Sequence, residues 1–149
     1  MSEPTSKELR AAQVAHTLAR AVRSDEVNPI DASRILKHEL RRLNTNRSQR
    51  LEIRSHRAQA SIDKYAPDRP LPNGSDDALH SDHVYPFTTD LLYEAMTVAD
   101  WVAELQRLAT VVCVTARENY TLEQIEKTGS RGPEKYAAAD VTFTTPVPW

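Results

Sequence analysis

The residues best suited to chemistry lie in two short stretches of the second half of the chain. Asp82 and His83 are adjacent, within a segment over residues 78–87 whose centre we expect to form a short strand. Asn119 and Glu123 are four residues apart in a predicted helix and so share one helical face. Carboxylate and amide oxygens suit hard cations such as Mg²⁺ or Mn²⁺, and an imidazole that titrates near neutrality can act as a general base. These residue types could therefore form a cation site beside a proton acceptor.

Local signals predict the elements that must position these residues. The apolar, β-branched run over residues 111–114 predicts a buried strand. Thr115 and Glu118 form a capping-box pattern, which predicts a helix from Ala116 to about Lys127. Residues 89–109 read as a helical insertion between the two strands. The predicted order is therefore strand, helical insertion, strand and helix.

The motif Asp82-His83-Val84-Tyr85-Pro86, followed by Asn119 on the later helix, resembles the His-Me finger (HNH/ββα-metal) nuclease superfamily over about residues 78–128. In that superfamily a strand carries a general-base histidine, often preceded by Asp, and a second strand leads into a helix. The resemblance implies that His83 is the general base, and that Asp82 and Asn119 ligate a divalent cation, Mg²⁺. Glu123 could add a ligand, as could Glu126, at the position where an HNH-type member would place its histidine.

The chain also departs from the pattern of the superfamily. No histidine follows Asn119, and the 36-residue gap from His83 to Asn119 holds the helical insertion. The single cysteine excludes a cysteine knuckle made by this chain, and Cys113, inside the apolar run, is expected to be a buried small residue rather than a nucleophile. A strand-end Asp82-His83 pair that hydrogen-bonds loop backbone remains an alternative. So does a transition-metal site that adds His80.

Charge is distributed unevenly along the sequence. The net charge is -2, but residues 1–65 hold 13 Lys and Arg against 8 Asp and Glu, and residues 66–149 hold 6 against 13. A basic region beside an acidic, cation-binding region suits nucleic-acid binding, and two complementary halves equally suit a homodimer. The arginines that could follow a phosphate backbone are Arg42, Arg47, Arg50, Arg54 and Arg57. Arg131 and Lys135, on either side of Gly132, could also contact phosphate.

The domain prediction has three parts. Helices are expected over residues 5–23, 30–43 and 47–65, which together form a basic helical region over residues 1–65. Residues 66–77, with three prolines and an Asn-Gly pair, are a predicted linker, and residues 78–149 a C-terminal ββα-like domain. The fold class is therefore α+β and mainly helical, with N-terminal helices and a small ββα-like element that carries a helical insertion.

The favoured function is a metal-dependent endonuclease, a hydrolase that cleaves phosphodiester bonds in nucleic acid, with DNA as the expected partner. The alternatives are a non-catalytic nucleic-acid-binding or regulatory protein and a helical homodimeric interaction protein. No apolar run approaches the ~20 residues that a membrane span needs, so no membrane partner is expected. One cysteine and no visible secretory signal favour a reducing, cytoplasmic location.

Overall fold

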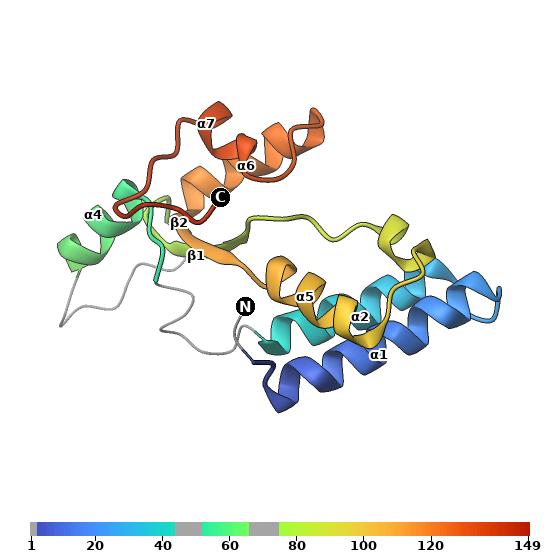
Figure 1. Cartoon of the computed structure of the whole chain (residues 1–149). Coiled ribbons are helices and arrows are strands. Elements are labelled where there is room, and N and C mark those ends of the chain that lie inside the picture. Colours follow the sequence, from blue (N-terminus) through green and yellow to red (C-terminus); the bar gives the residue numbers. More distant parts are fainter. Residues whose placement is uncertain (1–2, 44–51, 66–74) are drawn as a thin grey trace. The chain divides into compact units, whose positions relative to one another are not determined.

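The computed structural model describes residues 3–43, 52–65 and 75–149 (Figure 1). Its contacts divide the chain into two compact units. We call the first, Met1–Thr45 with Pro86–Thr110, the helical unit. The second, Asn46–Tyr85 with Val111–Trp149, is the mixed unit. The fold class is α+β and mainly helical, as predicted.

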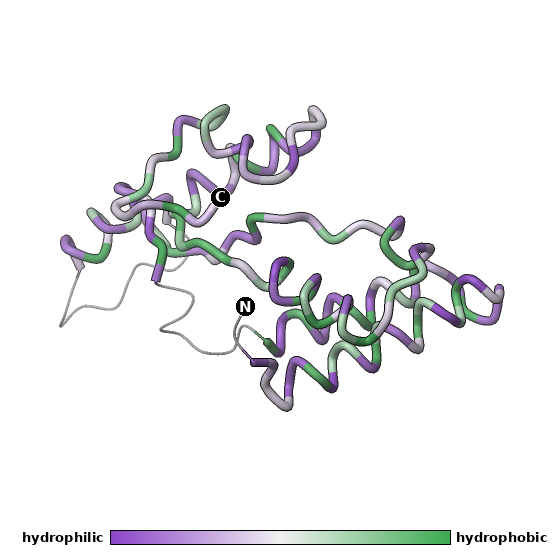
Figure 2. The backbone as a smooth tube through the Cα atoms, viewed as in Figure 1, coloured by the Kyte–Doolittle hydropathy of each residue, from purple (hydrophilic) through white to green (hydrophobic). Residues whose placement is uncertain are grey.

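The helical unit contains α1 (Ser6–Arg23), α2 (Pro29–Leu43), the 3-10 helix η1 (Thr89–Tyr93) and α5 (Val98–Leu108). The helix α1 packs against α2, η1 and α5. Its buried face consists of Ala11, Ala12, Ala15, Ala19 and Val22. Four of these five side chains are methyl groups, which let the neighbouring helices approach closely. Green hydrophobic and purple hydrophilic segments alternate along α1 and α2, as expected for helices with one buried face (Figure 2).

The mixed unit is built on β1 (Leu79–His83) and β2 (Val111–Thr115), which pair antiparallel with His83 opposite Val111. Every residue of β2 is buried. The helix α6 (Ala116–Lys127) packs on both strands and is followed by α7 (Glu134–Ala138). The predicted order is confirmed, because β1 is separated from β2 and α6 by η1 and α5.

The units follow different boundaries from the predicted domains. Residues 86–110 belong to the helical unit, because α5 and η1 cover α1. Residues 52–65 belong to the mixed unit, because α4 (His56–Tyr65) and the segment before it contact β2. Of the predicted linker, residues 66–74 lie outside the described residues, and the remainder forms a turn in which Ala78 N donates to Ser75 O at 3.1 Å.

The prediction of a helix over residues 47–65 is wrong in its described N-terminal part. Residues 52–53 form a bend and residues 54–55 form isolated β-bridges. Cys113 N donates to Ile53 O at 2.8 Å, and Ser55 N donates to Cys113 O at 3.0 Å. The helix α4 begins only at His56. Pairing with β2 therefore overrides the helical periodicity of this segment, while residues 47–51 lie outside the described part.

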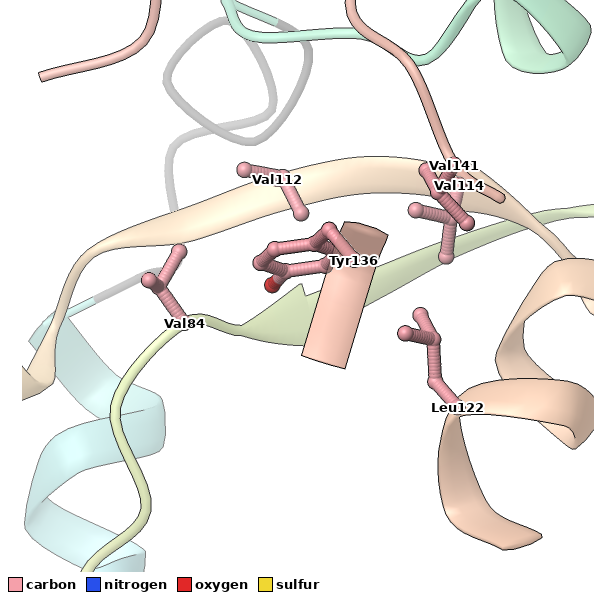
Figure 3. Packing of buried hydrophobic residues seen from close by; sticks show 6 residues of the cluster. All are labelled: Val84, Val112, Val114, Leu122, Tyr136 and Val141. Carbon is pink, nitrogen blue, oxygen red and sulfur yellow. The ribbon is translucent and has the colours of Figure 1, made fainter. Parts of the chain in front are cut away.

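The core of the mixed unit forms between the sheet and the two helices that follow it. It consists of Val84, Val112, Val114, Leu122, Tyr136 and Val141. Figure 3 shows the Tyr136 ring among the valines of the two strand segments, with Leu122 of α6 close by. Phe143 meets the Tyr136 ring edge-on and Trp149 stacks on it, with centroids 5.1 and 5.5 Å away. The C-terminal segment thus packs against its own unit.

Within the described ranges, no helix is long and apolar enough to cross a membrane.

Candidate functional site

The predicted ligands have different partners. Asp82 lies in β1, where its Oδ2 accepts a hydrogen bond from the Tyr136 hydroxyl at 2.6 Å. Asn119 lies in the first turn of α6, and its Nδ2 donates to Glu123 Oε1 at 3.3 Å. Glu123 is exposed. No interaction joins Asp82 to this pair in the described part of the chain, and no three His, Cys, Asp or Glu side chains gather there in a way that could hold a metal ion.

A different set of oxygens surrounds one cationic nitrogen. Lys135 Nζ lies 2.7 Å from Glu126 Oε1, 3.0 Å from Asp82 Oδ2 and 2.8 Å from the backbone oxygen of His83. The Lys135 side chain is 2% exposed, whereas those of Asp82 and Glu126 are 12% and 36% exposed. We call these three oxygens the cation cradle. It joins the end of β1, the last turn of α6 and the first turn of α7.

Two glycines allow the chain to bring Lys135 back over the sheet. Gly129 follows α6 with φ of +105°, and Gly132 precedes α7 with φ of +91°. This left-handed region is costly for residues that carry a Cβ. Lys135 N then donates to Gly132 O at 3.2 Å, which starts α7. The prediction that Lys135 contacts phosphate is not supported by this position, because its ammonium is buried among protein oxygens.

Tyr136 completes the surroundings of Asp82. Burial raises the pKa of the Tyr136 hydroxyl far above its ordinary value of 10.0, and the charge of Asp82 raises it further. The hydroxyl therefore stays protonated and acts as a donor to Asp82 Oδ2. This leaves the carboxylate with one neutral donor and one cationic donor.

The cradle oxygens are of the chemical kind that binds hard cations, although only two of them come from side chains. All three atoms are oxygens, two from carboxylates and one from a backbone carbonyl, and this is the ligand chemistry that Mg²⁺ and Mn²⁺ prefer. Two carboxylates share a single ammonium, so the cluster carries one negative charge in excess. A divalent cation held by both carboxylates would have to replace Lys135 Nζ, because that nitrogen occupies the point on which the oxygens converge.

His83, the predicted base, is the last residue of β1 and is half-buried. Side chains alternate along a strand, so the imidazole leaves β1 on the opposite face from Asp82 and Val84, which lie on the Tyr136 side. β1 pairs with β2 along one edge, and no strand covers its other edge within the described ranges. The free edge of β1 is therefore the place where a group could approach both side chains.

His80 is exposed and lines a separate open cavity of about 290 Å³ together with Arg117 and Tyr120. It takes part in no described cluster of three potential metal ligands. The transition-metal alternative based on His80, Asp82 and His83 therefore has no assembled ligand set in the described structure.

The predicted arginine surface is distributed over both units. Arg42 is on α2 in the helical unit, where it lies 3.7 Å from Glu39. The backbone of Arg54 forms an isolated parallel β-bridge with Cys113. Arg57 is exposed on α4 in the mixed unit. Arg57 lines an open cavity of about 600 Å³ with Lys64 and Arg117. Arg47 and Arg50 lie outside the described residues.

Cys113 is buried, as predicted. Burial raises the pKa of its thiol to about 11, so the thiolate needed for nucleophilic chemistry is scarce at neutral pH.

Another carboxylate in the mixed unit, that of Glu118, is buried and has neutral partners. Its Oε1 accepts from Ser55 Oγ at 2.6 Å and from Thr115 N at 3.0 Å. Ser55 Oγ also accepts from Ala58 N at 3.0 Å, so one hydroxyl links the starts of α4 and α6. We call Ser55, Thr115 and Glu118 the cap cluster.

No protein-family model, curated protein or solved structure matches this chain. The case for any function therefore rests on the sequence motif and on the geometry of the cation cradle.

Proposed function

We propose that the chain is a metal-dependent endonuclease that hydrolyses phosphodiester bonds in nucleic acid, with DNA as the first substrate to test. The observation that carries the proposal is the convergence of Asp82 and Glu126 on one cation position. The backbone oxygen of His83 contacts the same position. This convergence occurs at the end of the first strand in a strand–strand–helix unit.

The proposal places Glu126, rather than Asn119 or Glu123, opposite Asp82 as a ligand. Glu126 meets the same ammonium as Asp82, whereas Asn119 and Glu123 pair with each other on α6. Bound between the two carboxylates, Mg²⁺ would supply positive charge to the scissile phosphate and the leaving oxygen.

The remaining roles belong to side chains of the mixed unit. His83 takes a proton from the attacking water, as an imidazole can do near neutral pH. Tyr136 fixes Asp82 Oδ2 through its hydroxyl. Arg57 and Arg117, with Lys64, offer cationic groups to the phosphate backbone around the larger cavity, although Asp76 and Asp77 line it as well.

One observation favours a second candidate, a non-catalytic nucleic-acid-binding protein. The cradle is already filled by the Lys135 ammonium, whose burial is nearly complete. If Lys135 never leaves, the ββα-like unit serves only as a scaffold. Salt-sensitive binding without cleavage would then be the whole activity.

A cleavage assay tests both candidates. The wild-type chain is incubated with DNA and RNA substrates in Mg²⁺, Mn²⁺ or EDTA, beside Glu126→Ala and the matched variant Glu123→Ala. Both positions are on α6, three residues apart, but only Glu126 belongs to the cradle. We expect metal-dependent cutting by the wild type and Glu123→Ala, and a loss of about 10²-fold or more in Glu126→Ala. Binding without cutting by a folded wild-type chain would favour the second candidate.

A further inference from the structure

Two open cavities of the mixed unit adjoin at the start of α6. The larger, of about 600 Å³, is lined by α4, the turn before β1 and the start of α6. The smaller, of about 290 Å³, is lined by the same turn and by the first turns of α6. Asp76 and Arg117 line both of them. We call the two together the double cavity.

Hydrogen bonds hold the walls of the double cavity in place. On one side, Ser61 Oγ of α4 donates to Asp77 O at 2.6 Å. On the other side, Arg117 N of α6 donates to Asp76 O at 3.2 Å. The turn before β1 is thus tied to both helices. A site whose walls are already held loses less conformational entropy when a ligand binds.

The larger cavity has an excess of positive charge. Arg57 and Arg117 line it and are exposed, and neither guanidinium takes part in an ion pair within the described ranges. The Lys64 ammonium lies 3.7 Å from the Asp77 carboxylate, so these two charges balance. One carboxylate, that of Asp76, then stands against two guanidinium groups. A guanidinium group binds phosphate oxygens through two parallel donors, so phosphate is the anion that suits this cavity.

The smaller cavity adds an aromatic ring beside these charges. Tyr120 is 65% exposed and lies three residues after Arg117, on the same face of α6. The methyl groups of Ala78 and Ala116 line the same cavity. An exposed ring with apolar neighbours is a surface on which a nucleobase can stack. One ring suffices for one stacked base, so His80, which also lines this cavity, has no assigned contact.

The geometry points to single-stranded nucleic acid as the ligand of the double cavity, with phosphates at Arg57 and Arg117 and a neighbouring base on Tyr120. This inference rests on the proposed function, because it names the form of nucleic acid that the chain takes. A base in a duplex is paired and stacked between its neighbours, whereas a base in a single strand can turn out onto a protein ring. Phosphate contacts beside a ring therefore select for an unpaired strand.

The two kinds of contact differ in their dependence on salt. Each phosphate neutralised on a single strand contributes about -0.7 to the slope of log affinity against log salt. Contacts at Arg57 and Arg117 therefore predict a slope of about -1.4. Stacking on Tyr120 should contribute about 10-fold in affinity at any salt concentration.

Fluorescence anisotropy of the full chain in EDTA tests binding without cleavage. The probes are a labelled DNA strand of about 12 nucleotides, its duplex, an RNA strand of the same sequence, and an abasic strand of equal length. We expect the DNA or the RNA strand to bind about 10-fold more tightly than the abasic strand, which has the same phosphates, and more tightly than the duplex. The arm that binds more tightly identifies DNA or RNA. Equal affinity for the base-containing and abasic strands, tighter binding of the duplex, or no binding at all would overturn the inference.

Substitutions on α6 assign the contacts. Tyr120→Ala should bind the single strand about 10-fold more weakly, and Tyr120→Trp should bind it at least as tightly as the wild type. The control Tyr93→Ala, which removes a tyrosine that is 55% exposed in the helical unit, should match the wild type. Arg117→Gln should reduce the salt slope by about 0.7, whereas Lys127→Gln, at the other end of α6, should leave it unchanged.

These variants should fold, because the replaced side chains are exposed, and circular dichroism checks that they do. A folded Tyr120→Ala chain that binds the single strand like the wild type would contradict the base contact. An unchanged salt slope in Arg117→Gln would contradict the phosphate contact.

Binding in EDTA separates the inference from the proposed function. A preference for single strands in a chain that cuts nothing in Mg²⁺ would keep the inference and remove the nuclease. Metal-dependent cutting by a chain that binds base-containing and abasic strands equally would keep the nuclease and remove the inference.

Discussion

Two carboxylate clusters in the mixed unit differ in what neutralises them. In the cap cluster, Glu118 is 2% exposed and its carboxylate accepts from a serine hydroxyl and from the backbone and hydroxyl of Thr115. These donors are neutral, and all of them belong to residues that immediately precede α4 or α6. In the cation cradle, Asp82 and Glu126 share one ammonium.

The difference in counter-charge distinguishes a cluster with a structural role from a cluster that is a candidate for chemistry. The partners of Glu118 fix two chain segments, and replacing them with a ligand would undo the starts of α4 and α6. The cradle instead holds a cation on a long side chain and keeps an excess negative charge. The burial of the Glu118 carboxylate is therefore no guide to function, because neutral donors that start two helices account for it.

Asp82→Ala should cause the largest loss of stability and of cleavage. The buried Lys135 ammonium would lose one of its two carboxylate partners, and Tyr136 would lose its acceptor. Breaking a buried ion pair costs about 3–5 kcal/mol, and because Glu126 remains we expect a loss near 3 kcal/mol. Urea unfolding measures it, and cleavage should fall to background. Retained stability together with retained cleavage would remove the cradle as a distinct site.

Glu118→Ala should be nearly as damaging to stability but leave the chemistry intact. Ser55 Oγ and Thr115 N would lose their buried acceptor, and we expect a loss of about 2 kcal/mol in the free energy of unfolding. Glu118→Gln, which keeps an acceptor oxygen, should recover part of it. Mn²⁺ affinity of the folded variants should match that of the wild type. A large drop in that affinity would show that the two clusters are not independent.

Tyr136→Phe should have the smallest effect. At neutral pH the variant loses one hydrogen bond to Asp82, worth about 1–2 kcal/mol, and keeps its ring packing. The pKa of Tyr136 is raised in the folded chain, so its contribution to stability is full below the ordinary value of 10.0 and declines as the pH rises above it. Wild-type and variant stabilities should therefore stay apart up to about pH 10 and converge as the pH rises above it. Denaturant midpoints below and above this pH test the trend, and a constant difference would contradict the assigned pKa direction.

The parts of the fold that local signals control could be predicted from the sequence. The buried strand at residues 111–115 and the helix after it match the prediction, because an apolar β-branched run and a capping box act over a few residues. A Thr97–Asp100 capping box starts α5 in the same way.

The contacts that define the cradle were not predictable in this way. Tyr136 and Lys135 contact Asp82 and His83 across separations of 52–54 residues. The hydrophobic periodicity of a sequence does not indicate contacts over such distances along the chain. The only available signal was the position of Glu126, which the superfamily resemblance had marked. The β-bridged segment before α4 was missed for a similar reason, since its partner β2 lies far away in sequence.

The most direct test of the nuclease proposal is cleavage by His83→Ala compared with His80→Ala. Both histidines lie on β1, but only His83 adjoins Asp82, and His80 lines another cavity. We predict that His83→Ala remains folded, still binds Mn²⁺ and loses about 10²-fold or more of the cleavage rate, while His80→Ala cuts like the wild type. Equal cleavage by both variants would contradict the assignment of His83 as the base.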